Sequence, residues 1–190
     1  MDELGLEQPV TAAQRIFRTL LTALSEPGRV LDLPICCAPP EGLDPAAMAA
    51  VLALCDGDTP LWLDAAGRAA APYIRFHTGA PIVAGMGDAL FLLAEARHRP
   101  PLALLRPGTP EYPDRSATLI LAVEELREGE GWRLSGPGIA GARRLAVPDV
   151  DEGFAAEWRA NHARFPLGVD IIFAARDRVA ALPRSTRLEA

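Results

Sequence analysis

The stretch FPLGVDIIFAARDRVAALPRST, residues 165–186, places a short apolar run between two turn signals and ends on a rigid arginine. Gly168 can supply a backbone position with positive φ, and the residues from Val169 to Phe173 then predict a buried strand. Asp170 lies near the start of this strand. Because burying an unpaired carboxylate is costly, we expect Asp170 to have a partner.

A stiffened polar turn follows this strand region. Pro183 fixes φ directly before Arg184, Ser185 and Thr186, so a cation and hydroxyl groups leave the body of the protein together. Such a turn can hold an anion or a neighbouring chain. The alternative is that Asp170 makes a local cap or salt bridge, while Arg184 is a solvated residue near the C-terminus.

Composition favours one globular domain spanning residues 1–190. A chain of 190 residues with 49% hydrophobic and 23% charged residues can bury a single core. The formal net charge of -6 argues against nucleic-acid binding, which needs a basic surface. We find neither a secretion signal nor an apolar run of membrane-spanning length. We interpret Cys36, Cys37 and Cys55 as reduced structural thiols. We therefore expect a cytoplasmic protein without a membrane partner.

The chain contains no lysine. All 19 of its Lys and Arg residues are arginines, so no side chain can form a Schiff base with a carbonyl substrate or with pyridoxal phosphate. Arginine suits carboxylates and phosphates, but a coding bias explains the same composition without any function. We expect no cofactor.

Helices and strands alternate along the chain. We expect a first helix with a capping box at Thr11 and Gln14 that ends at Ser25, a second helix over 44–55 and a last helix over 151–164. The expected strands are 29–33, 61–63, 89–94 and 116–123, with 132–135 and 143–147 as a hairpin. This order predicts one α/β domain with a mixed sheet and helices packed on it.

The chemical motifs are incomplete. GPGIAG at 136–141 has the spacing of a dinucleotide loop, but a strand-like segment follows it where a helix is required, so we interpret it as a tight turn. His77 lies in a predicted loop, where it could act as an acid, a base or a phosphate donor, or simply pin the loop. The histidines lack metal-ligand spacing, and no serine lies in a nucleophile elbow, so the sequence predicts neither a metal site nor a catalytic residue.

Seven segments together resemble one family. They are ALSEPGR at 23–29, LCDGDTPLWL at 54–63, FHTGAP at 76–81, GTPEYPDRSATLIL at 108–121, LSGPGIAG at 134–141, FPLGVDIIF at 165–173 and LPRST at 182–186. In this order they are similar to the PhnH family, the H subunit of the bacterial carbon-phosphorus lyase system. The resemblance implies a fold similar to the large domain of pyridoxal-phosphate-dependent transferases without that cofactor, a homodimer, and a place in a complex with other lyase subunits.

The resemblance implies a role in joining an alkylphosphonate to the ribose of ATP, with displacement of adenine. It brings no established catalytic residue. Two hypotheses follow: an accessory, non-catalytic subunit, or an enzyme or binding site for ATP or a phosphonate-bearing ribose phosphate. The candidate anion-binding or ligand-binding residues are Arg29, His77, Thr78, Gly79, Arg184, Ser185 and Thr186. We expect the turns at 25–29, 76–79 and 183–186 to meet near a subunit contact.

Overall fold

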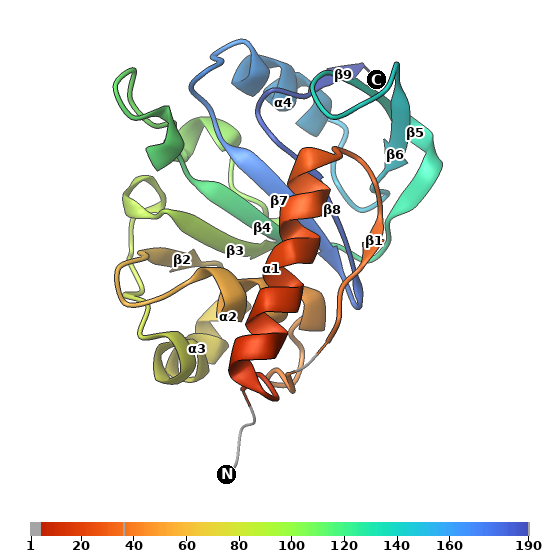
Figure 1. Cartoon of the computed structure of the whole chain (residues 1–190). Helices are drawn as coiled ribbons and strands as arrows, with labels where there is room; N and C mark the ends of the chain where they lie inside the picture. The colour runs from red at the N-terminus through yellow and green to blue at the C-terminus, as the bar shows by residue number, and fades with distance from the viewer. Residues whose placement is uncertain (1–4, 36, 190) are drawn as a thin grey trace.

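A mixed six-stranded sheet forms the centre of the molecule (Figure 1). The computed structural model describes residues 5–35 and 37–189. The sheet order is β1-β8-β7-β4-β3-β2. Its strands are β1 (Leu31–Asp32), β2 (Leu61–Leu63), β3 (Phe91–Glu95), β4 (Thr118–Ala122), β7 (Asp170–Ala175) and β8 (Arg178–Leu182). Strands β2, β3, β4 and β7 are parallel, whereas β8 and β1 add antiparallel pairs. The expected α/β class with a mixed sheet is confirmed.

Helices and a small second sheet cover the two faces of the central sheet. The helices α1 (Pro9–Ser25), α2 (Pro45–Leu54) and α3 (Ala71–Thr78) share one core cluster with the first face. Helix α4 (Phe154–His162) covers the other face together with β5 (Arg127–Ser135), β6 (Arg143–Ala146) and β9 (Arg187–Glu189). The order of this small sheet is β6-β5-β9. The described part of the chain contains no helix with the length and hydropathy needed to cross a bilayer.

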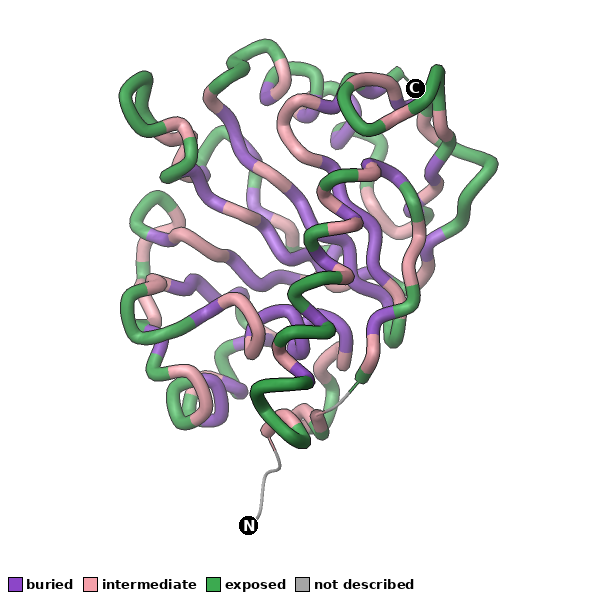
Figure 2. Tube along the Cα trace, in the orientation of Figure 1, coloured by how far each residue is buried: buried purple, intermediate pink, exposed green. Residues whose placement is uncertain are grey.

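Strand β7 is buried on both faces, as its continuous apolar sequence predicts. Ile171 and Phe173 pack in the core on the α4 side, whereas Ile172 and Ala174 pack in the core beneath α1 and α2. Buried residues accordingly follow the central strands in Figure 2. A parallel strand with helices on both sides needs no polar face, which explains why alternation is absent here.

The first helix begins earlier than expected. The capping box at Thr11 is wrong, because α1 begins at Pro9, a residue that suits the first turn, and Gln8 stands at its N-cap without a side-chain hydrogen bond. The second helix begins as expected. Its N-cap residue Asp44 accepts a hydrogen bond from the backbone N–H of Ala47 at 2.9 Å.

The segment around His77 is helical, although the sequence suggested a loop. Helix α3 buries Tyr73 and Ile74 against the core and ends at Gly79, whose φ of 73° closes the helix in the left-handed region. The expected hairpin is confirmed, because β5 and β6 pair antiparallel. Strand β9, which the sequence did not reveal, extends it into the small sheet.

The cysteines are only partly described. Cys36 lies outside the described residues, and Cys37 is partly buried. Cys55 is buried directly after α2, where desolvation raises the pKa of its thiol to about 12. Its thiol is therefore protonated at neutral pH, as expected for a structural cysteine.

Candidate functional site

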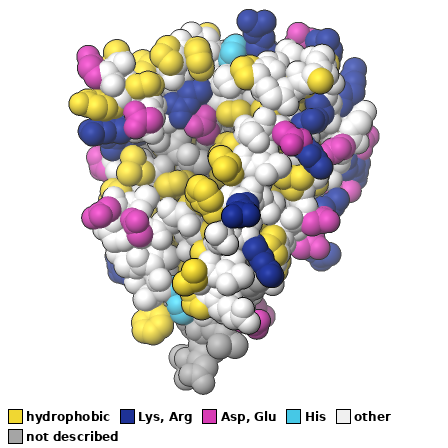
Figure 3. Space-filling model, viewed as in Figure 1, with side chains coloured by type: hydrophobic (Ala, Val, Ile, Leu, Met, Phe, Trp, Pro, Cys, Tyr) yellow, Lys and Arg dark blue, Asp and Glu magenta, His cyan; other side chains and the backbone are white. Residues whose placement is uncertain are grey.

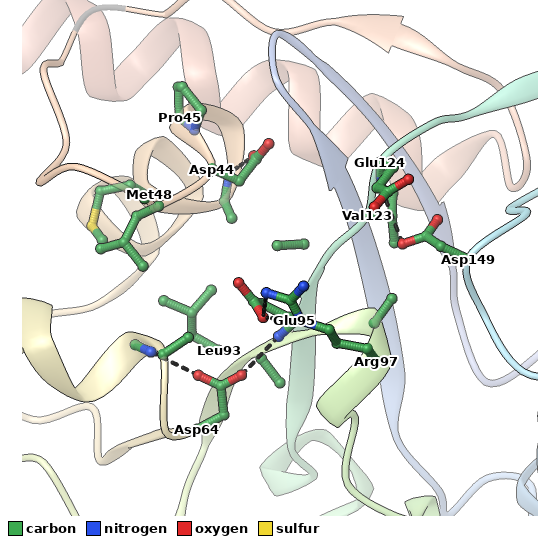
Figure 4. Close-up of a pocket in the computed structure, with 18 of the residues that line it drawn as sticks. Asp44, Pro45, Met48, Asp64, Leu93, Glu95, Arg97, Val123, Glu124 and Asp149 are labelled. Atoms are coloured by element: carbon green, nitrogen blue, oxygen red, sulfur yellow. Dashed lines mark hydrogen bonds and ion pairs between the residues drawn. The ribbon is translucent and has the colours of Figure 1, made fainter.

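A pocket of about 570 Å³ opens at the carboxyl ends of β2, β3 and β4 (Figure 4). Parallel strands end at one edge of a sheet, and open α/β sheets commonly bind ligands in the crevice outside these ends. The N-terminus of α2 and the turn between β7 and β8 complete the wall. The charged side chains that line it are Asp44, Asp64, Glu95, Arg97, Glu124, Asp149 and Arg176.

Asp64 ties two strand ends together at this pocket. It follows β2 directly and is only 4% exposed. Its Oδ1 accepts a hydrogen bond from the backbone N–H of Gly67 at 2.7 Å, and its Oδ2 accepts one from the N–H of Glu95 at 2.9 Å. Because backbone amides donate hydrogen bonds to both oxygens, the buried carboxylate has a structural role and holds the end of β2 to the end of β3.

The pocket carries an excess of negative charge. Its lining includes five carboxyl groups and two guanidinium groups. One of these cations, Arg97, is already engaged, because its Nε donates to Glu95 at 2.8 Å. Burial raises the pKa of Asp44 and of Asp149. Carboxylates accept hydrogen bonds from hydroxyl groups and repel free phosphates, so this lining suits a polyol or a cationic group better than an anion.

Three side chains near the pocket have the chemistry of metal ligands. Asp64, Glu95 and His98 can each offer one ligand atom, and these atoms lie within 4.8 Å of one another. The group is satisfied without an ion, because Glu95 pairs with Arg97 at 2.7 Å and approaches Nδ1 of His98 at 3.4 Å. We therefore assign no metal to it.

The sequence-predicted residue Arg29 lies in the turn after α1. Its guanidinium donates to Glu26 at 2.7 Å, and the arginine side chain is 48% exposed. An exposed pair three residues apart contributes little stability, so Arg29 is available to an external partner.

The predicted residues His77, Thr78 and Gly79 end helix α3. The hydroxyl of Thr78 donates to the carbonyl of Ile74 at 2.7 Å and accepts from the N–H of Ala80 at 3.0 Å. The ring of His77 packs edge-on against Tyr73. Its Nε2 is buried and has no hydrogen-bond partner in the described structure. These contacts fix the end of the helix.

The predicted residue Arg184 is held inside the structure. Its backbone N–H and its Nε donate to Oδ1 of Asp170 at 2.7 and 3.0 Å, and its Nη2 contacts Oδ2. Its Nη1 donates to the carbonyl of Pro113 at 2.6 Å. The local salt bridge considered for Asp170 is confirmed, but Arg184 is not solvated, because its side chain is only 14% exposed.

The two hydroxyl residues after Arg184 differ in accessibility. Ser185 is partly buried, whereas Thr186 is 0% exposed. The carbonyl of Thr186 accepts a hydrogen bond from Nε1 of Trp158 at 2.9 Å. The hydroxyl of Thr186 is buried and has no hydrogen-bond partner in the described residues. A ligand can reach Thr186 only if this turn opens.

Two of the three turns that we expected to meet, at 25–29 and 183–186, lie against the same third segment. The segment 134–141 touches both, since a Cβ on Gly138 would lie 2.0 Å from the carbonyl oxygen of Ser25 and one on Gly136 would lie 3.0 Å from that of Ser185. The turn at 76–79 lies elsewhere. A Cβ on Gly5, before α1, would lie 2.5 Å from His77, so the 17-residue helix α1 separates His77 from Ser25. The expectation that all three turns meet is wrong, because a helix of this length spans about 25 Å.

Sequence reasoning missed the pocket at the strand ends. The signal was present, because Asp64, Glu95 and Glu124 each lie at or just after the end of an apolar strand. Acidic residues at this position point into the crevice when the strands are parallel and adjacent. The sequence did not reveal that β2, β3 and β4 are neighbours, so these three residues were not recognised as parts of one site.

Comparison with known proteins identifies the family. The family model for the bacterial phosphonate metabolism protein (PhnH) matches residues 4–189. The chain is 41% identical over 187 residues to the alpha-D-ribose 1-methylphosphonate 5-triphosphate synthase subunit PhnH of Rhizobium meliloti (strain 1021), across 95% of this chain and 92% of that protein. It is 33% identical over 201 residues to the putative C-P lyase subunit protein HtxG of Stutzerimonas stutzeri, across 99% and 96% of the two chains. The chain belongs to the PhnH family.

Proposed function

We propose that this protein is an accessory subunit of a carbon-phosphorus lyase assembly. In this role it supports formation of alpha-D-ribose 1-methylphosphonate 5-triphosphate from ATP and an alkylphosphonate, without catalysing the transfer by itself. The observation that carries the proposal is the 41% identity to a named synthase subunit over nearly the full length of both chains.

The interactions of the polar side chains support an accessory role. Asp64 joins strand ends, Arg184 closes a turn onto Asp170, and Arg99 holds helix α4 through Asp151 and Glu157. Each of these groups already has its hydrogen-bond partners within the fold. Charged groups engaged in this way stabilise a rigid surface, which suits a subunit that positions other proteins or their substrate.

We also propose that the protein is cytoplasmic and forms a homodimer. The resemblance to the PhnH family supports these assignments. Light scattering of the purified chain tests the second one. A mass of twice 20.3 kDa is expected, and a strictly monomeric particle at micromolar concentration contradicts it.

Reconstitution tests the accessory role. The full chain is co-expressed with the other subunits of the lyase system from the same genome, and the assembly is purified through a tag on another subunit. We expect the chain in the assembly, no ribose product from the chain alone with ATP and methylphosphonate, and lower product formation when it is omitted. Turnover by the isolated chain overturns the proposal.

The alternative is a binding site for ATP or a phosphonate-bearing ribose phosphate in this chain. The pocket of about 570 Å³ at the strand ends favours it, because such a volume accommodates a small molecule. Its carboxylates suit the ribose hydroxyls, and its lining offers two cations for a phosphate, Arg176 and the Glu95-paired Arg97. Calorimetric titration with ATP tests this function. Weaker binding by Arg176→Ala supports it, and no heat of binding with the wild-type chain rejects it.

A further inference from the structure

Helix α1 exposes a second apolar face that the fold does not use. Its core side is formed by Ala12, Ile16, Leu20 and Ala23, which are all buried. On another side Val10, Phe17 and Leu21 are 86%, 49% and 55% exposed. We call these three residues the α1 stripe.

The spacing of the α1 stripe makes it continuous. Its members are seven and four residues apart, so at about 100° per residue they point in the same direction. The direction lies about 120° away from the centre of the buried side. Hydrophobic side chains lie along this helix in Figure 3, which views the molecule from the α1 side. An isolated exposed leucine is ordinary, but an aligned stripe with a phenylalanine indicates a contact surface.

The charged residues of α1 have one sign. Arg18 and Arg15 are exposed on this helix at about 80° and about 140° from the direction of the α1 stripe, so Arg18 borders it, and α1 contains no acidic residue. Neither guanidinium forms an ion pair within residues 5–35 and 37–189. The protein as a whole has a net charge of -6, so the positive charge of α1 is opposite in sign to the net charge of the protein.

We propose that the α1 stripe is the docking surface for a different subunit of the assembly, which presents an apolar groove edged by carboxylates. The inference rests on the proposed function, because it assumes that the chain is incorporated into such an assembly. Charge decides between this occupant and a second copy of the chain. In a two-fold contact each stripe faces itself, so Arg18 of one copy comes near Arg18 of the other, and α1 has no carboxylate to pair with either.

The test measures binding of purified chain to the purified assembly that lacks it. The double variant Phe17→Asp, Leu21→Asp places charges on the stripe and leaves the buried side of α1 unchanged. We expect its Kd to rise at least about tenfold, since exposed aromatic anchors dominate such contacts. Leu104→Asp is the matched control, because Leu104 is 58% exposed and lies on the short turn that contacts α4 on the opposite face of the sheet. We expect its Kd to stay within about twofold of wild type.

A second variant reports on the charge and does not touch the apolar residues. Arg18→Glu is expected to raise the Kd about fivefold or more at low salt, and to remove most of the salt dependence of binding. This variant decides the question even if the aspartate pair lowers stability, which circular dichroism and thermal unfolding will show.

The outcomes distinguish failure of the proposed function from failure of the docking surface alone. If wild-type chain does not bind the assembly, the proposed function fails and the docking surface fails with it. If wild type binds and both the aspartate pair and Arg18→Glu bind equally well, only the docking surface is overturned. The variant with the aspartate pair could instead join the assembly normally but change from a homodimer to a monomer, or no longer bind anionic lipid vesicles. Either result would show that another occupant covers the stripe, and the inference would be wrong.

Discussion

Arg184 surrounds the carboxylate of Asp170 with its own backbone N–H and with two side-chain nitrogens. The two residues are 14 positions apart, at the start of β7 and in the turn after β8. A bidentate guanidinium contact together with an amide from the same residue fixes both the position and the direction of the chain. This pair determines where the chain leaves the central sheet for β9.

Removal of Arg184 is expected to destabilise the fold. Arg184→Met leaves Asp170 largely buried without its cation, which should lower the free energy of unfolding by about 2–4 kcal/mol. Urea denaturation measures the loss. Arg133→Met is the control, because the Arg133–Glu189 pair is 47% and 60% exposed and should contribute less than about 1 kcal/mol. Equal losses from the two variants would contradict the structural role of Arg184.

The turn after β5 should tolerate no side chain at Gly138. This residue has a φ of 79°, and a Cβ would lie 2.0 Å from the carbonyl oxygen of Ser25. Gly138→Ala should therefore cost about 3 kcal/mol or more, since it combines backbone strain with displacement of the end of α1.

Gly141→Ala provides the control for this turn. Gly141 has a similar φ of 78° but has nothing within 4 Å of an added Cβ. It should show only the backbone cost of about 1 kcal/mol. Thermal unfolding of the two variants measures the difference, and identical melting temperatures would disprove the close approach.

Acid stability should depend on Arg99. Hydrogen bonds from its guanidinium lower the pKa of Asp151 below the ordinary 3.8 and that of Glu157 below 4.5. A carboxylate with a lowered folded pKa adds stability above its unfolded pKa and loses it as the pH falls through the folded value. The stabilisation should therefore be present above about pH 5 and fade below pH 4.

Arg99→Met tests this linkage. The methionine fills a site where the arginine side chain is 6% exposed, but it cannot form ion pairs with Asp151 and Glu157. The variant should have a lower melting temperature at pH 7 and a smaller decline between pH 5 and pH 3 than wild type. Parallel declines in the two proteins would show that other groups set the acid response. Both carboxylates are partly exposed, so high salt should also reduce the difference.

Thr186→Val should not destabilise the protein. The hydroxyl of Thr186 is buried and has no partner in the described structure, so replacing it with a methyl group removes a desolvated polar group. We expect a change between zero and about 1 kcal/mol in favour of the variant. Asn161→Leu is the contrasting variant, because Asn161 exchanges hydrogen bonds of 2.8 and 2.9 Å with the backbone of Val169. A large loss from Thr186→Val, measured in urea, would reveal a hidden partner of this hydroxyl.

Local signals were sufficient for much of the fold. The apolar run that follows Gly168 specified β7, and Asp44 with Pro45 specified the start of α2, because caps, proline and periodicity act within a few residues. The same reasoning failed at Thr11 and His77. There a proline at the first helical turn and burial of Tyr73 and Ile74 outweighed the local pattern.

The sequence by itself determined the α/β class, the lack of lysine chemistry, the demand that Asp170 be paired, and the resemblance to the PhnH family. Only the tertiary structure decided that the partner is Arg184, that Gly138 meets Ser25, and that carboxylates of separate strands line one pocket. These contacts join residues far apart in the chain. They depend on which strands become neighbours, and strand order follows from the packing of the whole core and cannot be read from any single segment.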